Sequence, residues 1–206
     1  MSLLASLLAH GTAPALTWYD ADGRVELSGK VLANHVAKVA NYLSDEVGLE
    51  PGAPVLLDLP LHWKTLTWAL GALVAGGRIR DAGAAGADVV VTNRPEAHAG
   101  ASAAEVIALN LDSFAFAWDG DLPQGVADGS ADVMGQPDSL VLAEGTDNVE
   151  RARGTLVIAE PSLLFRPTVA EATRALLAAC AGGASLVVVG EGDPERIAAA
   201  QRARIL

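Results

Sequence analysis

Residue types that commonly carry chemistry are scattered along this sequence. The four histidines, His10, His35, His62 and His98, include no pair spaced four residues apart and have no cysteine nearby, so we expect no metal site. The single cysteine, Cys180, lies in an apolar stretch without an adjacent acid or base, which favours a buried, inert thiol over a nucleophile. The Gly-x-Ser-x-Gly sequence of α/β-hydrolase nucleophiles does not occur. These patterns therefore predict no catalytic residue and no metal ligand.

One glycine-containing turn has the composition of an anion site. The segment Gly190-Glu-Gly192 follows an apolar run and precedes Asp193-Pro194, which can cap and begin a helix. Helix N-termini bind anions through free backbone N–H groups, but the Glu191 carboxylate disfavours an anion at this position. We interpret the segment as a simple turn.

Acidic residues dominate the middle of the chain. The 206 residues carry a formal net charge of −11, and the stretch from Pro95 to Glu150 contains eleven acids but no Lys or Arg. Such a surface repels phosphate backbones and anionic lipids, which argues against nucleic-acid and membrane-surface binding. We interpret the stretch as solvated acidic loops. Two alternatives stay open, a basic partner and weak cation binding by Asp119, Asp121 and Asp128, although the acid spacing does not match the EF-hand.

The hydrophobic pattern predicts an α/β protein in which buried strands alternate with helices. Runs of Val, Ile and Leu without alternation are typical of parallel strands that are covered on both faces. Residues 20–23 have the sequence of a hairpin turn, and Ser28 can cap the amphipathic helix that follows. We expect helices over residues 3–8, 29–47, 61–75, 168–181 and 193–204. We expect strands over residues 15–19, 24–27, 54–59, 87–92, 105–109, 139–143, 154–159 and 184–189.

The sequence also bears on the compartment. The first ten residues lack the basic start of a signal peptide, and Leu3, Leu4, Leu7 and Leu8 fit one face of a short docking helix. No apolar run approaches the roughly 18 residues of a transmembrane helix. Together with the single cysteine, which cannot pair within the chain, these features predict a cytoplasmic protein.

Several segments in order resemble the start of the acyl-adenylate-forming superfamily, which includes acyl-CoA synthetases, luciferases and peptide-synthetase adenylation domains. Gly48 and Gly52 match the glycines of the family's Gly-x-x-x-Gly-Asp-x-Val turn, and Ala53 replaces its usual Asp. The similar segments are the helix at 32–43, the turn and strand at 47–60, the apolar helix at 69–77, the strand at 88–92, and the helix, Gly-rich turn and strand at 176–189, followed by 193–195.

This resemblance implies an architecture. We expect two associated, mostly parallel sheets with flanking helices, as in the N-terminal subdomains of acyl-CoA synthetases. The whole of 1–206 is then a single compact unit of two lobes. One lobe consists of about residues 52–160, and the other of about residues 1–51 plus 161–206.

The phosphate-binding loop of the superfamily, Thr-Ser-Gly-Thr-Thr-Gly-x-Pro-Lys, has a degenerate counterpart at 137–148. Gly145 and Thr146 match its central Gly-Thr, so the resemblance makes them the candidate cofactor-binding residues. Glu144 and Asp147 replace a Ser and a Thr, and no Pro-Lys follows. A like-charge pair at 4 Å costs on the order of 4 kcal/mol at an effective dielectric constant near 20, so these carboxylates oppose a triphosphate. We expect that the loop does not bind ATP in the family's manner.

Full members of the superfamily are much longer than 206 residues, so the resemblance implies only their N-terminal portion. The groups that recognise adenine, ribose and metal, and the lysine that assists adenylation, belong to later segments. We therefore expect a catalytically inactive binding or interaction module without a cofactor, which self-associates or binds a protein partner through uncovered apolar surface. Two alternatives stay open: nucleotide binding or ligase activity completed by a partner chain, and an unrelated small-molecule module with its ligand at the carboxyl ends of the strands.

Overall fold

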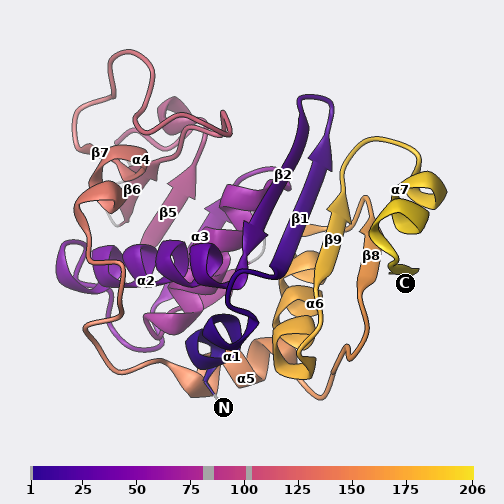
Figure 1. Cartoon of the computed structure of the whole chain (residues 1–206). Coiled ribbons are helices and arrows are strands. Elements are labelled where there is room, and N and C mark those ends of the chain that lie inside the picture. Colours follow the sequence, from indigo (N-terminus) through magenta and orange to yellow (C-terminus); the bar gives the residue numbers. More distant parts are fainter. Residues whose placement is uncertain (1, 81–85, 101–103) are drawn as a thin grey trace.

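The computed structural model describes residues 2–80, 86–100 and 104–206, which form two sheets with helices packed between and around them (Figure 1). The first sheet, here called the β1 sheet, consists in spatial order of β10 (Arg204–Ile205), β8 (Ser162–Phe165), β9 (Leu186–Val189), β1 (Pro14–Asp20) and β2 (Gly23–Ser28). The second, the β3 sheet, consists of β4 (Arg78–Arg80), β3 (Pro54–Asp58), β5 (Val89–Thr92), β6 (Glu105–Ala108) and β7 (Val126–Asp128). Only the β1–β2 hairpin is antiparallel among these described strands. The expected α/β fold of two mostly parallel sheets is confirmed.

The helices of the described residues are α1 (Leu3–His10), α2 (Gly29–Asp45), α3 (Trp63–Val74), α4 (Gly129–Asp132), α5 (Thr146–Arg153), α6 (Val169–Gly182) and α7 (Pro194–Gln201), with single turns η1 (Pro95–Ala97) and η2 (Val133–Gly135). Helix α3 is buried along its whole length and packs against α2, α5 and α6 (Figure 1). Of the helices described, none combines the length and the apolar character that crossing a bilayer requires.

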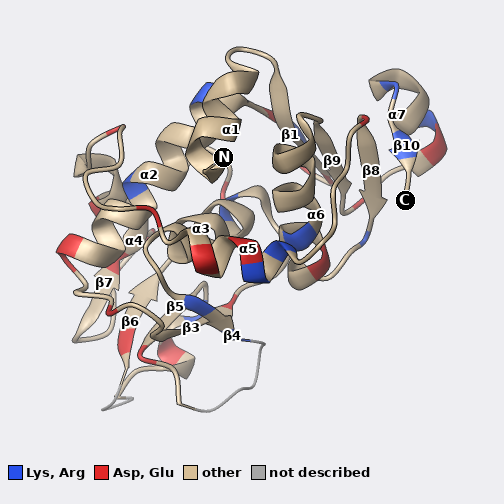
Figure 2. Ribbon diagram, turned by 90° about the horizontal axis from the view of Figure 1, so that it is seen from below, with Lys and Arg blue, Asp and Glu red and all other residues tan. Residues whose placement is uncertain are grey.

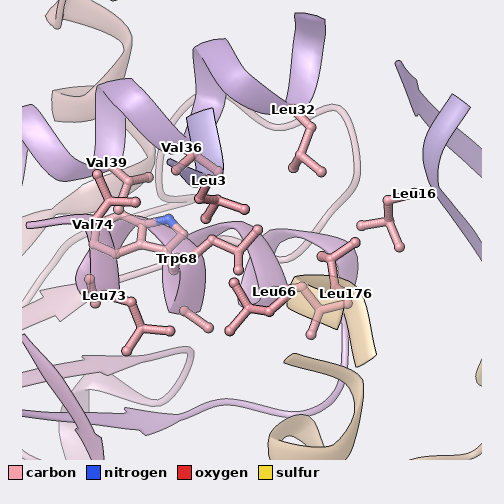
Figure 3. Packing of buried hydrophobic residues seen from close by; sticks show 14 of the residues in the cluster. Leu3, Leu16, Leu32, Val36, Val39, Leu66, Trp68, Leu73, Val74 and Leu176 are labelled. Carbon is pink, nitrogen blue, oxygen red and sulfur yellow. The ribbon is translucent and has the colours of Figure 1, made fainter. Parts of the chain in front are cut away.

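One hydrophobic cluster extends from the β1 sheet through the helices to the β3 sheet (Figure 3). It includes Leu16 of β1, Leu32 of α2 and Trp68 of α3, all of which are almost fully buried. Helices α2 and α3 approach so closely that a Cβ added to Gly71 would overlap the Val39 side chain. The two sheets therefore share one core, and that core includes the interface between them.

Polar caps set the element boundaries where the sequence predicts them. Ser28 Oγ accepts a hydrogen bond from Val31 N–H at the start of α2, and Asp193 Oδ1 accepts two from the first turn of α7. The Asp20 carboxylate accepts the N–H groups of Asp22 and Gly23, which closes the β1–β2 hairpin. These short-range predictions are confirmed because each needs only neighbouring residues.

Two expected strands are wrong. Residues 139–143 and 154–159 have irregular backbones. In the first segment, Asn41 Oδ1 of α2 accepts Val141 N–H, at 3.1 Å. In the second, Ile158 N–H donates to a backbone carbonyl of α6, also at 3.1 Å. A side chain and a helix thus bind these backbone groups, so an apolar run alone did not identify a strand.

Candidate functional site

The candidate cofactor residues Gly145 and Thr146 lie at the start of α5, beside the C-terminal end of α3. The Gly145 N–H donates to Val74 O at 2.7 Å, and the Thr146 N–H donates to Glu144 O at 2.8 Å. Both N–H groups that a phosphate would use are therefore bonded within the protein. Thr146 itself is exposed to solvent.

Glu144 and Gly145 fix this segment against two other elements. Glu144 Oε1 accepts the Leu3 N–H at the start of α1, at 2.6 Å, and Asn148 Nδ2 donates to Gly76 O, at 2.5 Å. A Cβ added to Gly145 would lie 2.7 Å from a carbonyl oxygen of α3 and 2.8 Å from Gly76 Cα. Glycine is required here because the backbone of the segment lies directly on the end of α3. The backbone of Gly145 is therefore tightly packed against the end of α3, whereas Thr146 and Asp147 at the same helix start are exposed.

A cleft lies at the other end of the strands. The parallel strands point away from α5 (Figure 1), and carboxyl ends of strands from both sheets surround a space of about 380 Å³. Its lining comes from the ends of β1 and β9 and from the segments after β3, β6 and β8, so both sheets contribute. Crevices at the carboxyl ends of α/β strands are the usual ligand sites of such folds. The lining residues are Trp18, Asp20, Pro60, Leu61, His62, Leu111, Arg166, Pro167, Gly190 and Glu191.

His62 forms one wall of this cleft and is held neutral. Its ring meets the Trp18 ring edge to face, with 5.8 Å between centroids, and its Nδ1 accepts the Lys64 N–H at 3.2 Å. Burial, and then the nearby Lys64 charge, lower the pKa of His62 to about 4. At neutral pH the imidazole is therefore uncharged, and its proton is on Nε2 because Nδ1 is the acceptor.

Ser113 lies near His62 without forming a nucleophile–base pair. His62 Nε2 is 3.5 Å from Ser113 Oγ, which also accepts the Trp63 Nε1–H at 3.2 Å. A base must present an unprotonated nitrogen to the hydroxyl, and Nε2 carries the proton here. The pair therefore fixes the position of the loop after β6 and does not activate the serine.

Lys64 of α3 also binds the loop after β6. Its Nζ donates to the backbone oxygens of Asn110, Asp112 and Ala115, at 2.9, 2.5 and 3.0 Å. These three bonds use all three donors of the ammonium group, and burial lowers the pKa of Lys64. Lys64 is thus a structural cation that orders the residues after β6.

Arg166 is the basic group of the cleft. Its backbone is left-handed, with φ 48°, a conformation that costs energy for a residue with a side chain. Its Nε donates to Gly190 O at 3.2 Å, and its guanidinium lies 5.1 Å from the centre of the Phe165 ring. Both contacts fix the exposed side chain at the rim of the cleft, where it can meet an anion.

The acids beside Arg166 limit what the cleft can bind. Both carboxylate oxygens of Asp20 are used, one by Trp18 Nε1–H at 2.7 Å and the other by the hairpin N–H groups. Glu191 adds a second, exposed carboxylate. One arginine and two acids give this lining a net charge of −1, which opposes the binding of a triphosphate.

A second polar cluster lies where β3 and β5 end. Asp58 Oδ2 contacts His98 Nε2 at 2.8 Å, and Arg94 contacts both Asp58 oxygens at 2.9 and 3.0 Å. The His98 hydrogen bond and the Arg94 charge lower the pKa of Asp58. The carboxylate is already fully bonded, which makes the cluster a structural one. No group of three metal-ligating side chains occurs among residues 2–80, 86–100 and 104–206.

Comparison with known proteins places the chain in a family. No family model matches the sequence. The chain is 32% identical to a TIGR03089 family protein of Mycobacterium tuberculosis (strain ATCC 25618 / H37Rv), over 97% of this chain and 94% of that protein. The chain belongs to the TIGR03089 family.

Solved structures show the fold of this TIGR03089 chain. All of it superposes on 47% of an acyl-CoA synthetase from Brucella canis, with a TM-score of 0.75 and 16% identity. The amide bond synthetase McbA from Marinactinospora thermotolerans matches with a TM-score of 0.64 and 17% identity, over 98% of this chain and 46% of McbA. ATP-bound MatB from Rhodopseudomonas palustris matches with a TM-score of 0.63 and 18% identity, over 95% of this chain and 46% of MatB. The resemblance to the adenylate-forming fold is thus confirmed, and the chain spans about half the length of these enzymes.

Sequence patterns in this TIGR03089 chain did not identify the cleft. They selected Gly145 and Thr146, which the structure places together but at the opposite end of the strands. They assigned Gly190 and Glu191 to a simple turn, and this turn forms part of the cleft rim. Arg166 has no motif around it. The signal that could have located it is positional, since Arg166 directly follows β8, but the sequence analysis expected no strand at 162–165.

Proposed function

We propose that this chain is a binding or interaction module built on the adenylate-forming fold, without adenylating activity of its own. The hydrogen bonding of Glu144, Gly145 and Thr146 within the protein carries the proposal. The N–H groups of Gly145 and Thr146 are bonded to backbone carbonyls, and Glu144 is bonded to Leu3 N–H. Binding triphosphate there would require breaking these bonds and placing two carboxylates, those of Glu144 and Asp147, beside the phosphates.

The test is ATP–pyrophosphate exchange with Mg²⁺ and a panel of carboxylic acids. We expect the wild-type chain to give the same exchange as a protein-free blank. A Glu144→Gln/Asp147→Asn variant serves as the matched control, because it removes both charges and leaves the Gly145 and Thr146 N–H groups bonded. Exchange above the blank by the wild type overturns the proposal. Exchange by the variant alone would assign the inactivity to charge and not to packing.

Nucleotide binding without catalysis is measured separately by thermal unfolding. Any ligand that binds the native state raises the melting temperature in proportion to the logarithm of its excess over Kd. We expect millimolar ATP to leave the melting temperature unchanged, because the Gly145 and Thr146 N–H groups are already bonded and the Glu144 and Asp147 carboxylates repel phosphate. A concentration-dependent rise with ATP that Glu144→Gln/Asp147→Asn enhances would show that this segment does open.

The cleft favours a second candidate, a small-anion or nucleotide site whose activity a partner chain completes. Its volume of about 380 Å³ and the exposed guanidinium of Arg166 support this alternative. AMP, with fewer charges than ATP, then raises the melting temperature, and Arg166→Gln removes the rise. Arg202→Gln is the matched control, since Arg202 is also exposed and left-handed but is not part of the cleft lining. An AMP effect that survives Arg166→Gln excludes the cleft.

We also propose a cytoplasmic location. Cys180 is a free cysteine that is almost fully buried, and burial raises the pKa of its thiol to about 12. A reduced, inert thiol of this kind is compatible with a reducing compartment. Fractionation of cells that produce the chain should recover it with soluble cytosolic markers, and recovery in a secreted or membrane fraction would contradict the proposal.

A further inference from the structure

The loop after β6 exposes aromatic side chains to water. Phe114 and Phe116 are 79% and 68% exposed. We call residues 110–118 the aromatic loop. Phenylalanine is enriched in the buried centres of protein interfaces, and two such side chains two positions apart form an apolar protrusion.

The aromatic loop is held by several hydrogen bonds although it lies on the surface. Lys64 donates to three of its backbone oxygens, Asn110 Nδ2 donates to Ala117 O, and Asp112 Oδ1 accepts the Phe114 N–H. Trp118 N–H is bonded to Asp128. A loop that is already ordered loses little conformational entropy on binding, so the exposed phenylalanines are presented in a conformation ready to dock.

The surroundings of the loop define the charge of its partner. Asp112, Asp119 and Asp121 are exposed on the loop and directly after it. They belong to the stretch between Pro95 and Glu150 that contains eleven acids and no Lys or Arg. A surface that receives Phe114 and Phe116 must therefore be apolar at its centre and basic at its rim.

A groove with this chemistry lies at the other side of the molecule. It has a volume of about 730 Å³ and runs along β8 and α6. We call it the arginine-rimmed groove. Leu156, Val157, Phe165 and Leu206 supply its exposed apolar surface, and Arg166, Arg174 and Arg204 supply its positive charge. Figure 2 shows blue segments on α6 and β10 at this side and red segments near β6, β7 and α4.

The acids of the groove do not cancel its positive charge. Glu160 pairs with Arg204 at 3.1 Å, and Glu171 accepts the Thr168 N–H as part of the cap of α6. Within the part of the chain that the structure describes, Arg166 and Arg174 form no ion pair. Two guanidinium groups thus remain to meet carboxylates from outside.

We propose that the aromatic loop of one copy of this chain docks into the arginine-rimmed groove of a second copy. This inference deepens and rests on the proposed function, because it names the partner of the interaction module. The apolar and charged features of the two surfaces are complementary. The loop and the groove lie on opposite sides of one molecule (Figure 1), so a copy cannot fill its own groove. The contact is therefore heterologous, and each bound copy leaves one loop and one groove free for further growth.

The experiment uses two variants that each remove one surface. Phe114→Asp/Phe116→Asp removes the exposed phenylalanines of the aromatic loop and leaves the groove unchanged. Val157→Asp/Arg174→Glu replaces an apolar and a basic side chain of the arginine-rimmed groove with acids and leaves the loop unchanged. All four side chains are exposed, so both variants should fold, which far-UV circular dichroism and the melting temperature check. Leu8→Asp/Val141→Asp is the control, since it places two acids at exposed apolar positions outside both surfaces.

Sedimentation velocity gives the readout. We expect the mass of the wild type and of the control to increase with concentration, and to fall towards that of the monomer in high salt, because charges contribute to the contact. Each surface variant alone should be monomeric. Their equimolar mixture should form a heterodimer and stop there, because its remaining loop and groove are both mutated.

Several results would overturn the proposal. They are a monomeric wild type at its highest soluble concentration, assembly that persists in either surface variant, loss of assembly in the control, and a mixture that stays monomeric. Each of these results is a measurement of the mass of the assembly. The proposed absence of adenylating activity is decided by pyrophosphate exchange, so failure of one proposal is distinguishable from failure of the other.

Discussion

The two ends of the strands differ in how their polar groups are used. At the amino ends, residues 144–148 match part of a phosphate-loop sequence, yet the Gly145 N–H and the Glu144 carboxylate are bonded to other parts of the protein, and the Thr146 N–H is bonded to Glu144 O. At the carboxyl ends, no motif is present, yet a cleft lies between the sheets with Arg166 at its rim. A match of residue types therefore does not establish that the matched groups are available to a ligand.

The bonds that close residues 144–148 come from distant parts of the chain. Leu3 is 141 positions away from Glu144, and Gly76 is 72 positions away from Asn148. Neither contact could be inferred from the segment itself. Four substitutions at the two ends of the strands should therefore lower the stability of the protein by different amounts.

The largest effect is expected at the carboxyl ends, from His62. The pKa of His62 is about 4 in the folded protein and 6.5 for an ordinary histidine, as in the unfolded chain. Above pH 6.5 the imidazole is neutral in both states, so its protonation does not reduce the free energy of unfolding. That free energy decreases as the pH falls from 6.5 to about 4, because the unfolded chain binds the proton first. At about 1.4 kcal/mol per pKa unit, the loss is on the order of 3 kcal/mol. Urea unfolding of wild type and His62→Gln at several pH values measures it.

The difference between the two pH curves isolates His62. Burial also lowers the pKa of His35, but that residue is present in both proteins and cancels. The pKa of Asp58 is lowered from 3.8, so its effect on stability falls at more acidic pH. Parallel curves for wild type and His62→Gln between pH 6.5 and 4 would mean that His62 is not buried as the cleft geometry requires.

The second effect concerns the amino ends. Gly145→Ala places a Cβ 2.7 Å from a backbone oxygen of α3 and 2.8 Å from Gly76 Cα, and backbone atoms cannot rotate away. Overpacking of this kind costs about 2 kcal/mol. Gly135→Ala is the control, because a Cβ there meets nothing within 4 Å. Equal free energies of unfolding for the two variants would show that residues 144–148 are open.

The fold could be predicted from the sequence more fully than the polar sites at either end of the strands. The hairpin, the caps at Ser28 and Asp193 and the buried strand at 184–189 follow from local chemistry, and the structure confirms them. Strands β4, β7 and β10 were missed because each contains at most three residues, too few for a periodic pattern. Strand β8 (Ser162–Phe165) was missed because the strand was expected in the apolar run before it, at 154–159. The cleft was missed because its residues come from separate strand ends, which only the assembled sheets bring together.

Lys64→Met tests how the carboxyl ends are ordered. Methionine keeps most of the side-chain volume but removes the three hydrogen bonds to the aromatic loop. We expect a loss of about 1 to 2 kcal/mol in the free energy of unfolding, since the three carbonyls become accessible to water and are partly compensated. Hydrogen exchange should accelerate at Phe114, whose N–H bond to Asp112 depends on the loop conformation. Unchanged exchange at Phe114 would show that Lys64 does not order the loop.

Glu144→Gln gives the smallest effect and separates charge from packing at the amino ends. Glutamine keeps an oxygen that can accept the Leu3 N–H, so only the charge-assisted part of this bond is lost, about 0.5 to 1 kcal/mol. Glu150→Gln on α5 is the control, because Glu150 is exposed and its side chain forms no hydrogen bond within the described residues. Chemical denaturation of the two variants measures the difference. If Glu144→Gln is instead as stable as wild type and gains ATP affinity, the Glu144 charge and not the backbone bonding of Gly145 and Thr146 is what keeps phosphate out.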